Sequence, residues 1–290
     1  MDIGVLIFPT DQTIDPVELA REAEARGYRS LWFPEHSHIP TSRATPWGGR
    51  DGAPPLPEFY WRTHDPFVAL AAAAAVTEHI TLGTGICLVS QRDPIHTAKE
   101  VASLDRISDG RFVFGVGYGW NKEEMAQHGT AYGDRRALLR EHLQLMSALW
   151  TQEEASYDGE HVSLEPSWSW PKPTQTSGRL GGPPIVLGGN AGPKTAADIA
   201  ELCDGWMPIG GAHPLANLAE IERACEAIGR DPATVELGMF GARPDDSSLE
   251  KLQEQGFARA MFGLPQGPRD EVLAALDEWQ PFVDRFAGEA

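Results

Sequence analysis

Short apolar runs alternate with amphipathic helical patterns along the whole length of the chain. The apolar runs predict strands at 3–8, 30–33, 80–89, 111–117, 183–189, 206–210, 235–242 and 257–265. A helical pattern follows each run, and the predicted helices cover 15–27, 65–79, 93–110, about 134–150, 192–205, 214–228, 246–255 and 268–286.

Apolar strands between amphipathic helices are typical of a parallel sheet that has helices on both faces. Eight such units in one chain most simply close into a (β/α)8 TIM barrel, which is an α/β fold. An open doubly wound sheet is the alternative, because several of the apolar runs have only four or five residues. In a barrel, the active site forms at the C-terminal ends of the strands.

The first predicted helix illustrates how the helix boundaries are set. Asp15 is a suitable N-cap, Pro16 suits the first helical position, and Glu18 fits a variant of the capping box. Gly27 closes the pattern. The pattern at 93–110 likewise begins with Asp-Pro and ends with glycine.

Two long stretches, 35–64 and 151–182, lack a regular pattern and are rich in proline, glycine and tryptophan. Loops of this length in a compact domain are usually lids or binding loops. The chain has 290 residues, 41% of them hydrophobic, and α/β barrels often reach this length as one domain. We therefore expect a single barrel domain over 1–290 with long loop insertions.

The charge and the cysteines narrow the range of partners and compartments. With 24 basic and 42 acidic residues, the net charge is −18, so nucleic acid and anionic membranes are not expected partners. No apolar run approaches the ~18 residues of a membrane helix, and the N-terminus lacks the basic segment of a signal peptide. Cys87, Cys203 and Cys225 form no C-x-x-C pair, which favours a reduced, cytoplasmic setting. Cys87 is expected to pack in the core.

Glycine, aromatic and histidine residues follow the predicted strands at the ends where a barrel has its active site. In chain order they are Phe8, Pro9, Glu35, His36, His38, Gly85, Ile86, Cys87, Gly117, Tyr118, Gly119, Trp120, Gly188, Gly189 and Asn190. Backbone N–H groups in a glycine-rich turn before a helix bind anions without a basic side chain. The glycine clusters after the fourth and fifth strands therefore favour a phosphate or cofactor site, although glycines also simply permit tight turns.

Two standard motifs do not fit. The pattern G-x-G-x-x-G, a nucleotide-binding motif, fails because Trp120 stands at the sixth position from Gly115, and no G-K-[ST] occurs.

His36 and His38 are spaced like a metal-binding pair, but the fifth and eighth strands end without the further His or Asp ligands, so we predict no metal. His38 is then interpreted as a surface histidine, whereas His36 beside Glu35 is a candidate functional residue.

The chain resembles the luciferase-like monooxygenase superfamily, and most of all its branch of F420-dependent oxidoreductases, in the run LGTGICLVSQRDPIHTAKEVASLDRISDGRFVFGVGYGWNKEEM at 82–125. The same pattern continues in the same order with SLWFPEH (30–36), YDGEHVSL (157–164), PKPTQ (171–175), PPIVLGGN (183–190) and CDGWMPIG (203–210). The resemblance covers essentially the whole chain. It implies a (β/α)8 barrel that holds a flavin or the deazaflavin coenzyme F420 and commonly forms a homodimer.

The resemblance also implies roles for individual residues. The phosphate and ribityl chain of the cofactor would lie against the glycine-rich segments, and its ring against a backbone bulge that contains a cis peptide bond without proline in relatives. That bond maps to Gly85–Ile86. An acidic residue and a histidine after the second strand map to Glu35 and His36, which would be catalytic. The cofactor-binding residues implied in this way are His36, Gly85, Ile86, Cys87, Gly117, Tyr118, Gly119, Gly188, Gly189 and Asn190.

Trp120 departs from the pattern of members that act on sugar phosphates, which carry a carboxylic acid at this position. An indole is apolar and has no titratable proton, so it cannot serve as a general acid. We therefore expect an apolar or aromatic substrate, with Phe8 and Trp120 lining its pocket. The tail of F420 carries glutamates, and the basic residues available for it are Arg43, Arg50, Lys172, Arg179 and Lys194.

The sequence thus predicts an oxidoreductase that transfers a hydride between coenzyme F420 and a small apolar or aromatic molecule. An FMN-dependent monooxygenase on the same barrel is one alternative, because both cofactors would place phosphate on the same glycines. A barrel that binds a cofactor without turnover is a further alternative.

Overall fold

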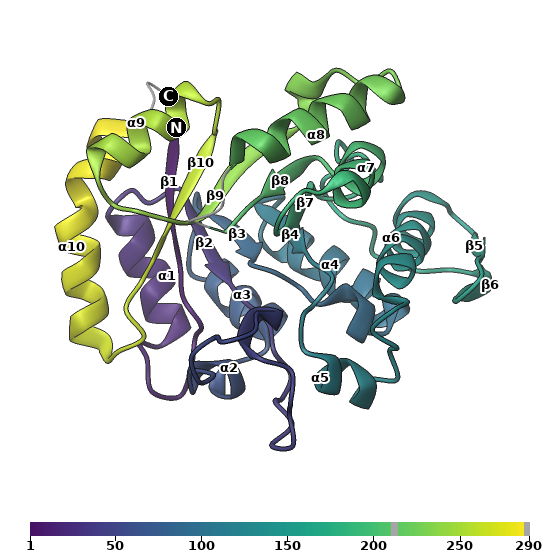
Figure 1. Cartoon of the computed structure of the whole chain (residues 1–290), viewed down its shortest axis with the longest axis horizontal. Coiled ribbons are helices and arrows are strands. Elements are labelled where there is room, and N and C mark those ends of the chain that lie inside the picture. The colour runs from purple at the N-terminus through teal and green to yellow at the C-terminus, as the bar shows by residue number, and fades with distance from the viewer. Residues whose placement is uncertain (210–213, 287–290) are drawn as a thin grey trace.

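The computed structural model describes residues 1–209 and 214–286, and a closed barrel of parallel strands forms its centre (Figure 1). The strands are β1 (Asp2–Leu6), β2 (Ser30–Phe33), β3 (Thr81–Thr84), β4 (Phe112–Val116), β7 (Ile185–Gly188), β8 (Gly205–Met207), β9 (Glu236–Ala242) and β10 (Arg259–Gly263). They are hydrogen-bonded in the order β1-β10-β9-β8-β7-β4-β3-β2. The predicted barrel is confirmed, and the closed sheet excludes the open alternative. The predicted run 206–210 ends at Gly210, which lies outside the described residues.

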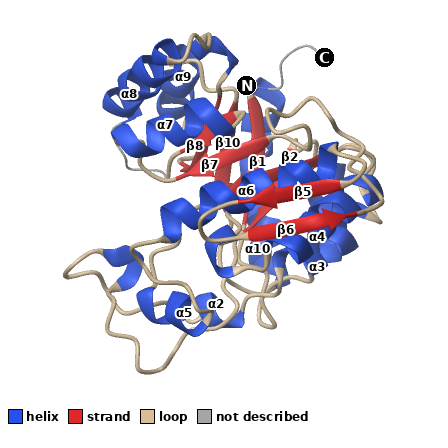
Figure 2. Ribbon diagram, turned by 90° about the vertical axis from the view of Figure 1, so that its right-hand side faces the viewer, coloured by secondary structure: helices blue, strands red, loops and turns tan. Residues whose placement is uncertain are grey.

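Helices surround this barrel and follow its strands in the chain (Figures 1 and 2). The main helices are α1 (Pro16–Ala25), α3 (Pro66–Ala74), α4 (Pro94–Ile107), α6 (Arg135–Thr151), α7 (Pro193–Leu202), α8 (Pro214–Ala227), α9 (Asp246–Glu254) and α10 (Arg269–Phe286). Each agrees with a predicted helical pattern. No helix within 1–209 or 214–286 has both the length and the apolar character that crossing a membrane requires.

The ends of α1 are formed largely as predicted. The Asp15 carboxylate accepts hydrogen bonds from the N–H groups of Val17 and Glu18 at 2.9 and 3.2 Å. Gly27 follows the helix with φ +81°, a left-handed conformation that glycine adopts without strain. Glu18 differs from the prediction: its carboxylate accepts from Arg269 Nε at 2.6 Å rather than closing a capping box, because α10 brings an arginine within reach.

Several short elements lie in the connections between the main strands and helices. They are the helices α2 (Phe59–Arg62) and α5 (Lys122–Gln127), the 3-10 turns η1 (Trp47–Gly49), η2 (Val89–Gln91) and η3 (Pro232–Thr234), and the strands β5 (Ala155–Asp158) and β6 (Ser163–Ser167). The stretch 151–182 is therefore not wholly irregular, because β5 and β6 form an antiparallel hairpin outside the barrel (Figure 2). Tyr157 Oη of this hairpin donates to Gln144 Oε1 of α6 at 2.8 Å.

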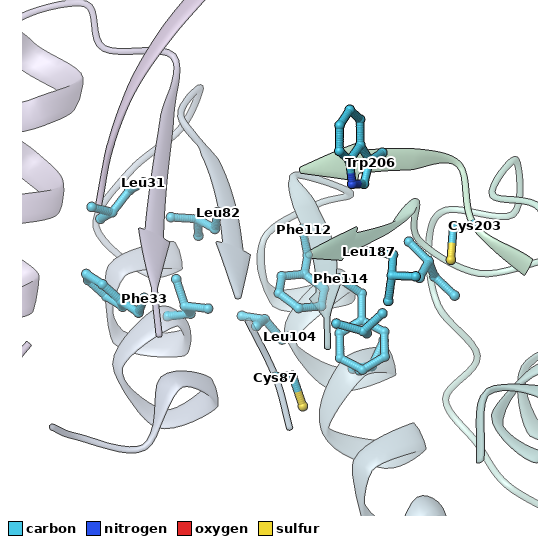
Figure 3. Packing of buried hydrophobic residues seen from close by; sticks show 14 of the residues in the cluster. Leu31, Phe33, Leu82, Cys87, Leu104, Phe112, Phe114, Leu187, Cys203 and Trp206 are labelled. Carbon is cyan, nitrogen blue, oxygen red and sulfur yellow. The ribbon is translucent and has the colours of Figure 1, made fainter. Parts of the chain in front are cut away.

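Alternating residues of the strands fill two separate apolar layers. Leu31, Phe33, Phe112 and Phe114 are buried in the layer shared with the helices, where Leu104 of α4 also lies (Figure 3). The residues between them face the barrel interior, which is filled by Leu6, Trp32, Val113, Val186, Met207 and Met261. The interior is therefore packed, and the open space lies above it at the strand ends.

Candidate active site

A cavity of about 390 Å³ lies at the C-terminal ends of the barrel strands, and we call it the barrel cavity. It is lined by Phe8, Pro34, Glu35, His36, Tyr60, Gly85, Ile86, Leu88, Gly117, Tyr118, Gly119, Trp120, Gly188, Gly189, Asn190, Met207, Ile209 and Phe240. Every predicted site residue is among them except Cys87. The Cys87 thiol is fully buried, and burial together with the neighbouring Glu35 charge raises its pKa well above the usual value.

The Gly85–Ile86 peptide bond is cis, as the family resemblance implies. The Ile86 side chain lies against two of the glycines singled out by the sequence. A Cβ on Gly117 would stand 2.3 Å from Ile86 Cδ1, and one on Gly188 would stand 2.8 Å from Ile86 Cγ2. These two glycines are therefore required by Ile86 itself, which fills the space where their side chains would be.

The other glycines of the alternating run have different neighbours. A Cβ on Gly115 would lie 1.9 Å from the Thr84 carbonyl oxygen, so Gly115 is crowded by the adjoining strand and offers no bare backbone to a ligand. Gly119 has φ +78° and abuts Met125. Gly189 is different, because it has φ +99° and no atom of the described residues lies within 4 Å of its Cβ position. The backbone open to a ligand is thus at Gly189 rather than along the whole glycine run.

His36 is paired with a carboxylate that the sequence interpretation missed. Its Nδ1–H donates to Glu124 Oε2 at 2.7 Å, and only 8% of His36 and none of Glu124 is exposed. Glu124 belongs to α5, whose N-cap residue is Asn121. Because Nδ1 is held by the carboxylate, Nε2 is the ring nitrogen left for a ligand or substrate. The arrangement is that of a buried acid–base histidine whose orientation is set by a carboxylate.

Glu35 lines the same cavity as His36 but has other hydrogen-bond partners. Its carboxylate accepts from the Leu88 N–H at 2.6 Å and from Arg92, which also donates to Glu100 at 2.6 Å. Burial lowers the pKa of Arg92, but the Glu35 and Glu100 carboxylates together with the other nearby groups outweigh this effect and raise the pKa above its usual value.

Aromatic rings line one side of the barrel cavity. The ring centroid of Tyr60 lies 4.7 Å from that of Phe8, 5.0 Å from His36 and 6.1 Å from Trp120. Trp120 also meets the His36 imidazole edge-on at 5.8 Å. Burial raises the pKa of Tyr60, so its hydroxyl stays neutral at physiological pH. Tyr60 comes from α2 and had no sequence signal beyond its place in an irregular, tryptophan-rich stretch.

Tyr118 is anchored from behind by a buried carboxylate. Its hydroxyl donates to Asp198 Oδ2 at 2.5 Å, and Asp198 is fully buried between Arg136 of α6 at 2.7 Å and Arg140. Burial and the Asp198 charge both raise the pKa of Tyr118. This wall of the cavity is therefore fixed to α6 and α7.

None of the five basic residues suggested for a cofactor tail lines the barrel cavity. Arg43 is beside it, with Cζ 5.7 Å from the centre of the Trp120 ring. Lys172 donates to the Leu149 carbonyl at 2.7 Å, and Arg179 donates to the Glu201 carbonyl at 2.7 Å. Lys172 and Arg179 thus bind carbonyl groups near the C-terminal ends of α6 and α7, whereas Arg43 lies beside the aromatic wall.

Glu123 fixes the loop that carries Arg43. Its Oε1 accepts from the N–H groups of Ala44 and Thr45 at 2.9 and 3.1 Å. Burial is the largest single influence and by itself would raise the pKa of Glu123, but the hydrogen bonds from the Thr45 side chain and from the backbone N–H groups together lower it from 4.5 to about 2. A carboxyl group with a lowered folded-state pKa stabilises the fold above its unfolded pKa and loses this effect as the pH falls toward the folded value.

We expect Glu123→Gln to lower the free energy of unfolding at pH 7 by on the order of 1 kcal/mol. The expected effect is this small because the Glu123 carboxylate is partly exposed to solvent, which weakens its electrostatic interactions. The difference from the unsubstituted protein should shrink as the pH falls from about 5 toward about 2, because the carboxyl group is protonated first in the unfolded chain and in the folded protein only near its pKa of about 2. Urea unfolding at several pH values measures it, with the exposed Glu153→Gln as control. A difference that does not vary with pH would contradict this account.

A family model described as luciferase-like monooxygenase matches residues 8–280. The chain belongs to this family. It is 40% identical over 297 residues to an uncharacterized protein of Mycobacterium tuberculosis, an alignment that covers 100% of this chain and 98% of the relative. It is 28% identical to the F420-dependent hydroxymycolic acid dehydrogenase of Mycobacterium tuberculosis, over 87% of this chain and 66% of the relative.

Solved structures of this family share the barrel at low sequence identity. The monooxygenase RslO1 from Streptomyces bottropensis has a TM-score of 0.78 and 18% identity, covering 99% of this chain and 100% of its own. The coenzyme F420-dependent tetrahydromethanopterin reductase from Methanopyrus kandleri has a TM-score of 0.72 and 17% identity, covering 95% and 96%. These structural similarities show that the chain shares the barrel fold.

Proposed function

We propose that the chain is an oxidoreductase that transfers a hydride between coenzyme F420 and a small apolar or aromatic organic substrate. The observation that carries the proposal is the buried His36–Glu124 pair, which opens onto the same cavity as the Gly189 backbone and the aromatic wall. The relative that dehydrogenates hydroxymycolic acid with F420 supports this choice over an FMN-dependent monooxygenase.

The barrel cavity has the features that a deazaflavin requires. The space beside Gly189, which a Cβ would occupy, suits a group that lies against bare backbone. The residues that would hold the cofactor are Gly117–Gly119 and Gly188–Asn190, with Ile86 between the two segments. No lysine or arginine lines the cavity, so backbone N–H groups would bind the phosphate. When bound, F420 supplies a two-electron hydride carrier.

His36 would manage the proton that accompanies hydride transfer. An alcohol that loses a hydride also loses its hydroxyl proton, and the reverse reaction requires a proton at the same oxygen. Imidazole accepts or donates a proton near neutral pH, and the Glu124 carboxylate stabilises the charged ring and fixes its tautomer. Trp120, Tyr60 and Phe8 would exclude water and bind the apolar part of the substrate.

The proposal includes a homodimer, as the family resemblance implies, and a cytoplasmic location. The three cysteines are free and buried, which agrees with a reducing compartment. Sedimentation of the purified protein measures the oligomeric state independently of its activity.

The test is a titration of the purified protein with F420 and, separately, with FMN. We expect micromolar affinity for F420, seen as a change in its fluorescence, and weaker binding of FMN. Turnover of a panel of alcohols, ketones and enones should follow. Tighter binding of FMN, with oxygen consumption, would favour the monooxygenase instead. Binding of F420 with no turnover on any substrate would favour a barrel without catalytic activity.

A matched pair of glycine variants locates the cofactor. Gly189 and Gly229 both have positive φ and no atom near their Cβ positions, but only Gly189 lines the barrel cavity. Substituting alanine causes similar backbone strain at both sites. We expect Gly189→Ala to weaken cofactor binding at least about tenfold, whereas Gly229→Ala should leave it unchanged. Equal cofactor affinities of the two variants would show that the cofactor does not lie against Gly189.

A further inference from the structure

Three potential metal ligands meet just outside the barrel cavity. His38 lies in the loop after β2, Glu124 is on α5, and His128 caps the C-terminus of α5. Each offers one ligand atom, and these atoms lie within 4.8 Å of one another. Glu124 and His128 are four residues apart, so they share one face of the helix. We call these three residues the His38 cluster; neither histidine lines the barrel cavity.

The carboxylate in this cluster is incompletely satisfied. Glu124 is fully buried, and its Oε2 accepts from His36. Its Oε1 has no hydrogen-bond partner among the residues that the structure describes. A buried acceptor without a partner is costly, and more so when it belongs to a charged group. A cation at the His38 cluster would supply the missing interaction.

His38 is already oriented as a metal ligand. It is not the isolated surface histidine expected from the sequence, because its Nε2 lies 2.6 Å from Gln127 Oε1. An amide oxygen only accepts, so Nε2 carries the proton and Nδ1 keeps its lone pair. Metal-binding histidines typically donate their second N–H to such an outer oxygen. Ser37 Oγ lies 2.9 Å from His38 Nδ1 and 2.7 Å from His128 Nε2, between the two rings.

We propose that His38, Glu124 and His128 bind a divalent transition metal ion of the zinc type, with water completing its coordination. Two imidazoles and one carboxylate match zinc, cobalt or nickel, whereas calcium and magnesium prefer oxygen ligands alone. Bonds of ~2.1 Å place tetrahedral zinc ligands about 3.4 Å apart, so side-chain shifts on the order of 1 Å complete the site.

The ion would have access from the surface on both sides of Ser37. One surface pocket of about 220 Å³ is lined by Ser37 and His128, and another of about 580 Å³ is lined by Ser37 and His38. Because Glu124 also accepts from His36, a bound ion would compete with the His36 imidazole for the same carboxylate. The site itself does not depend on the proposed function.

A second group of potential ligands serves as an internal comparison. Glu141, Glu160 and His161 also come within 4.8 Å of one another. However, Glu141 Oε2 already accepts from the N–H groups of His161 and Val162 at 2.8 and 3.1 Å, and Glu160 and His161 are exposed. This group therefore has no buried, unsatisfied oxygen to favour an ion.

The test is zinc binding by the full chain after treatment with a chelator, measured by competition with a chromogenic indicator. We expect one zinc ion per chain with micromolar affinity. Cobalt should give the intense visible bands of a tetrahedral site. His38→Ala and His128→Ala should each weaken zinc binding at least about tenfold, and His161→Ala should leave it unchanged. Circular dichroism checks that each variant is folded.

Three outcomes would overturn the proposal: no saturable zinc binding, binding that both histidine variants retain, or binding that only His161→Ala removes. If a histidine variant fails to fold, the cobalt spectrum of the unsubstituted chain decides the question. Weak bands of octahedral cobalt alone would then exclude the site. Zinc binding requires neither F420 nor a substrate, so its failure and failure of the proposed function are distinguishable.

Discussion

Replacing His36 by alanine is expected to lower the turnover number by about 10²–10⁴-fold, the usual range for loss of a general acid or base. The reason is that Nδ1 of His36 is held by Glu124 at 2.7 Å, which leaves Nε2 for the substrate. The fold should persist, because His36 lies at the end of β2 and lines the barrel cavity rather than the packed interior. Steady-state kinetics with F420 and an accepted substrate measures the change.

Glu124→Gln is a more specific test of the His36–Glu124 pair than His36→Ala, because it keeps the shape of the side chain and removes only its charge. Without the carboxylate, His36 Nδ1 loses the charged acceptor that orients its ring. We expect a fall in turnover within the same range. A change confined to KM would indicate a binding role for the pair.

The neighbouring residue provides the control. Glu123 is on the same helix, but its carboxylate accepts from the loop at Ala44 and Thr45 and does not contact His36. Glu123→Gln should therefore leave turnover and its pH profile unchanged. If His36→Ala and Glu124→Gln were as active as Glu123→Gln, the pair would have only a structural role.

The barrel could be predicted because its strands are continuous apolar runs and its helices are strongly amphipathic. Leu31 and Phe33 face the helices while Trp32 faces the interior, so both faces of β2 are apolar. The hairpin β5–β6 could not be predicted in this way, because it lies outside the barrel and buries one edge on α6 alone. Its short strands carry polar residues at most positions.

The site was predictable where it depends on backbone and not where it depends on distant side chains. Gly188, Gly189 and Asn190 follow a strand directly, so their place at the barrel rim follows from the fold alone. His36 and Glu124 are 88 positions apart, and the pairing depends on how α5 returns over the strand ends. The neighbouring Glu35 instead accepts hydrogen bonds from Arg92 and from the Leu88 N–H.

The structure was also needed to explain why glycines alternate at 115, 117 and 119. Gly115 accommodates the Thr84 carbonyl, Gly117 accommodates Ile86, and Gly119 adopts a positive φ. Three different constraints thus produce one regular pattern. The glycine pattern therefore indicated that other groups come close to this backbone, but it did not identify those groups.

The Trp120→Ala variant tests where the substrate binds. The indole lies 5.8 Å from His36 and 6.1 Å from Tyr60, with its face on the barrel cavity's aromatic side. Removing it deletes an apolar surface and an edge-to-face contact, which together correspond to about 2–4 kcal/mol. We therefore expect KM for an apolar substrate to rise on the order of 10²-fold, while Kd for the cofactor changes little.

Trp120→Phe and Trp168→Ala separate this role from packing. Phenylalanine keeps an aromatic face without the indole N–H, so KM should rise only slightly in the first variant. Trp168 is 78% exposed and lies beyond β6, outside the barrel cavity, so the second variant should match the unsubstituted protein. Kinetics, cofactor titration and thermal melting of all three variants give the comparison. If Trp120→Ala weakened the binding of substrate and cofactor equally, or lowered the melting temperature without changing KM, Trp120 would be a packing residue. It would then support the loop that carries Arg43, because Arg43 lies against its ring.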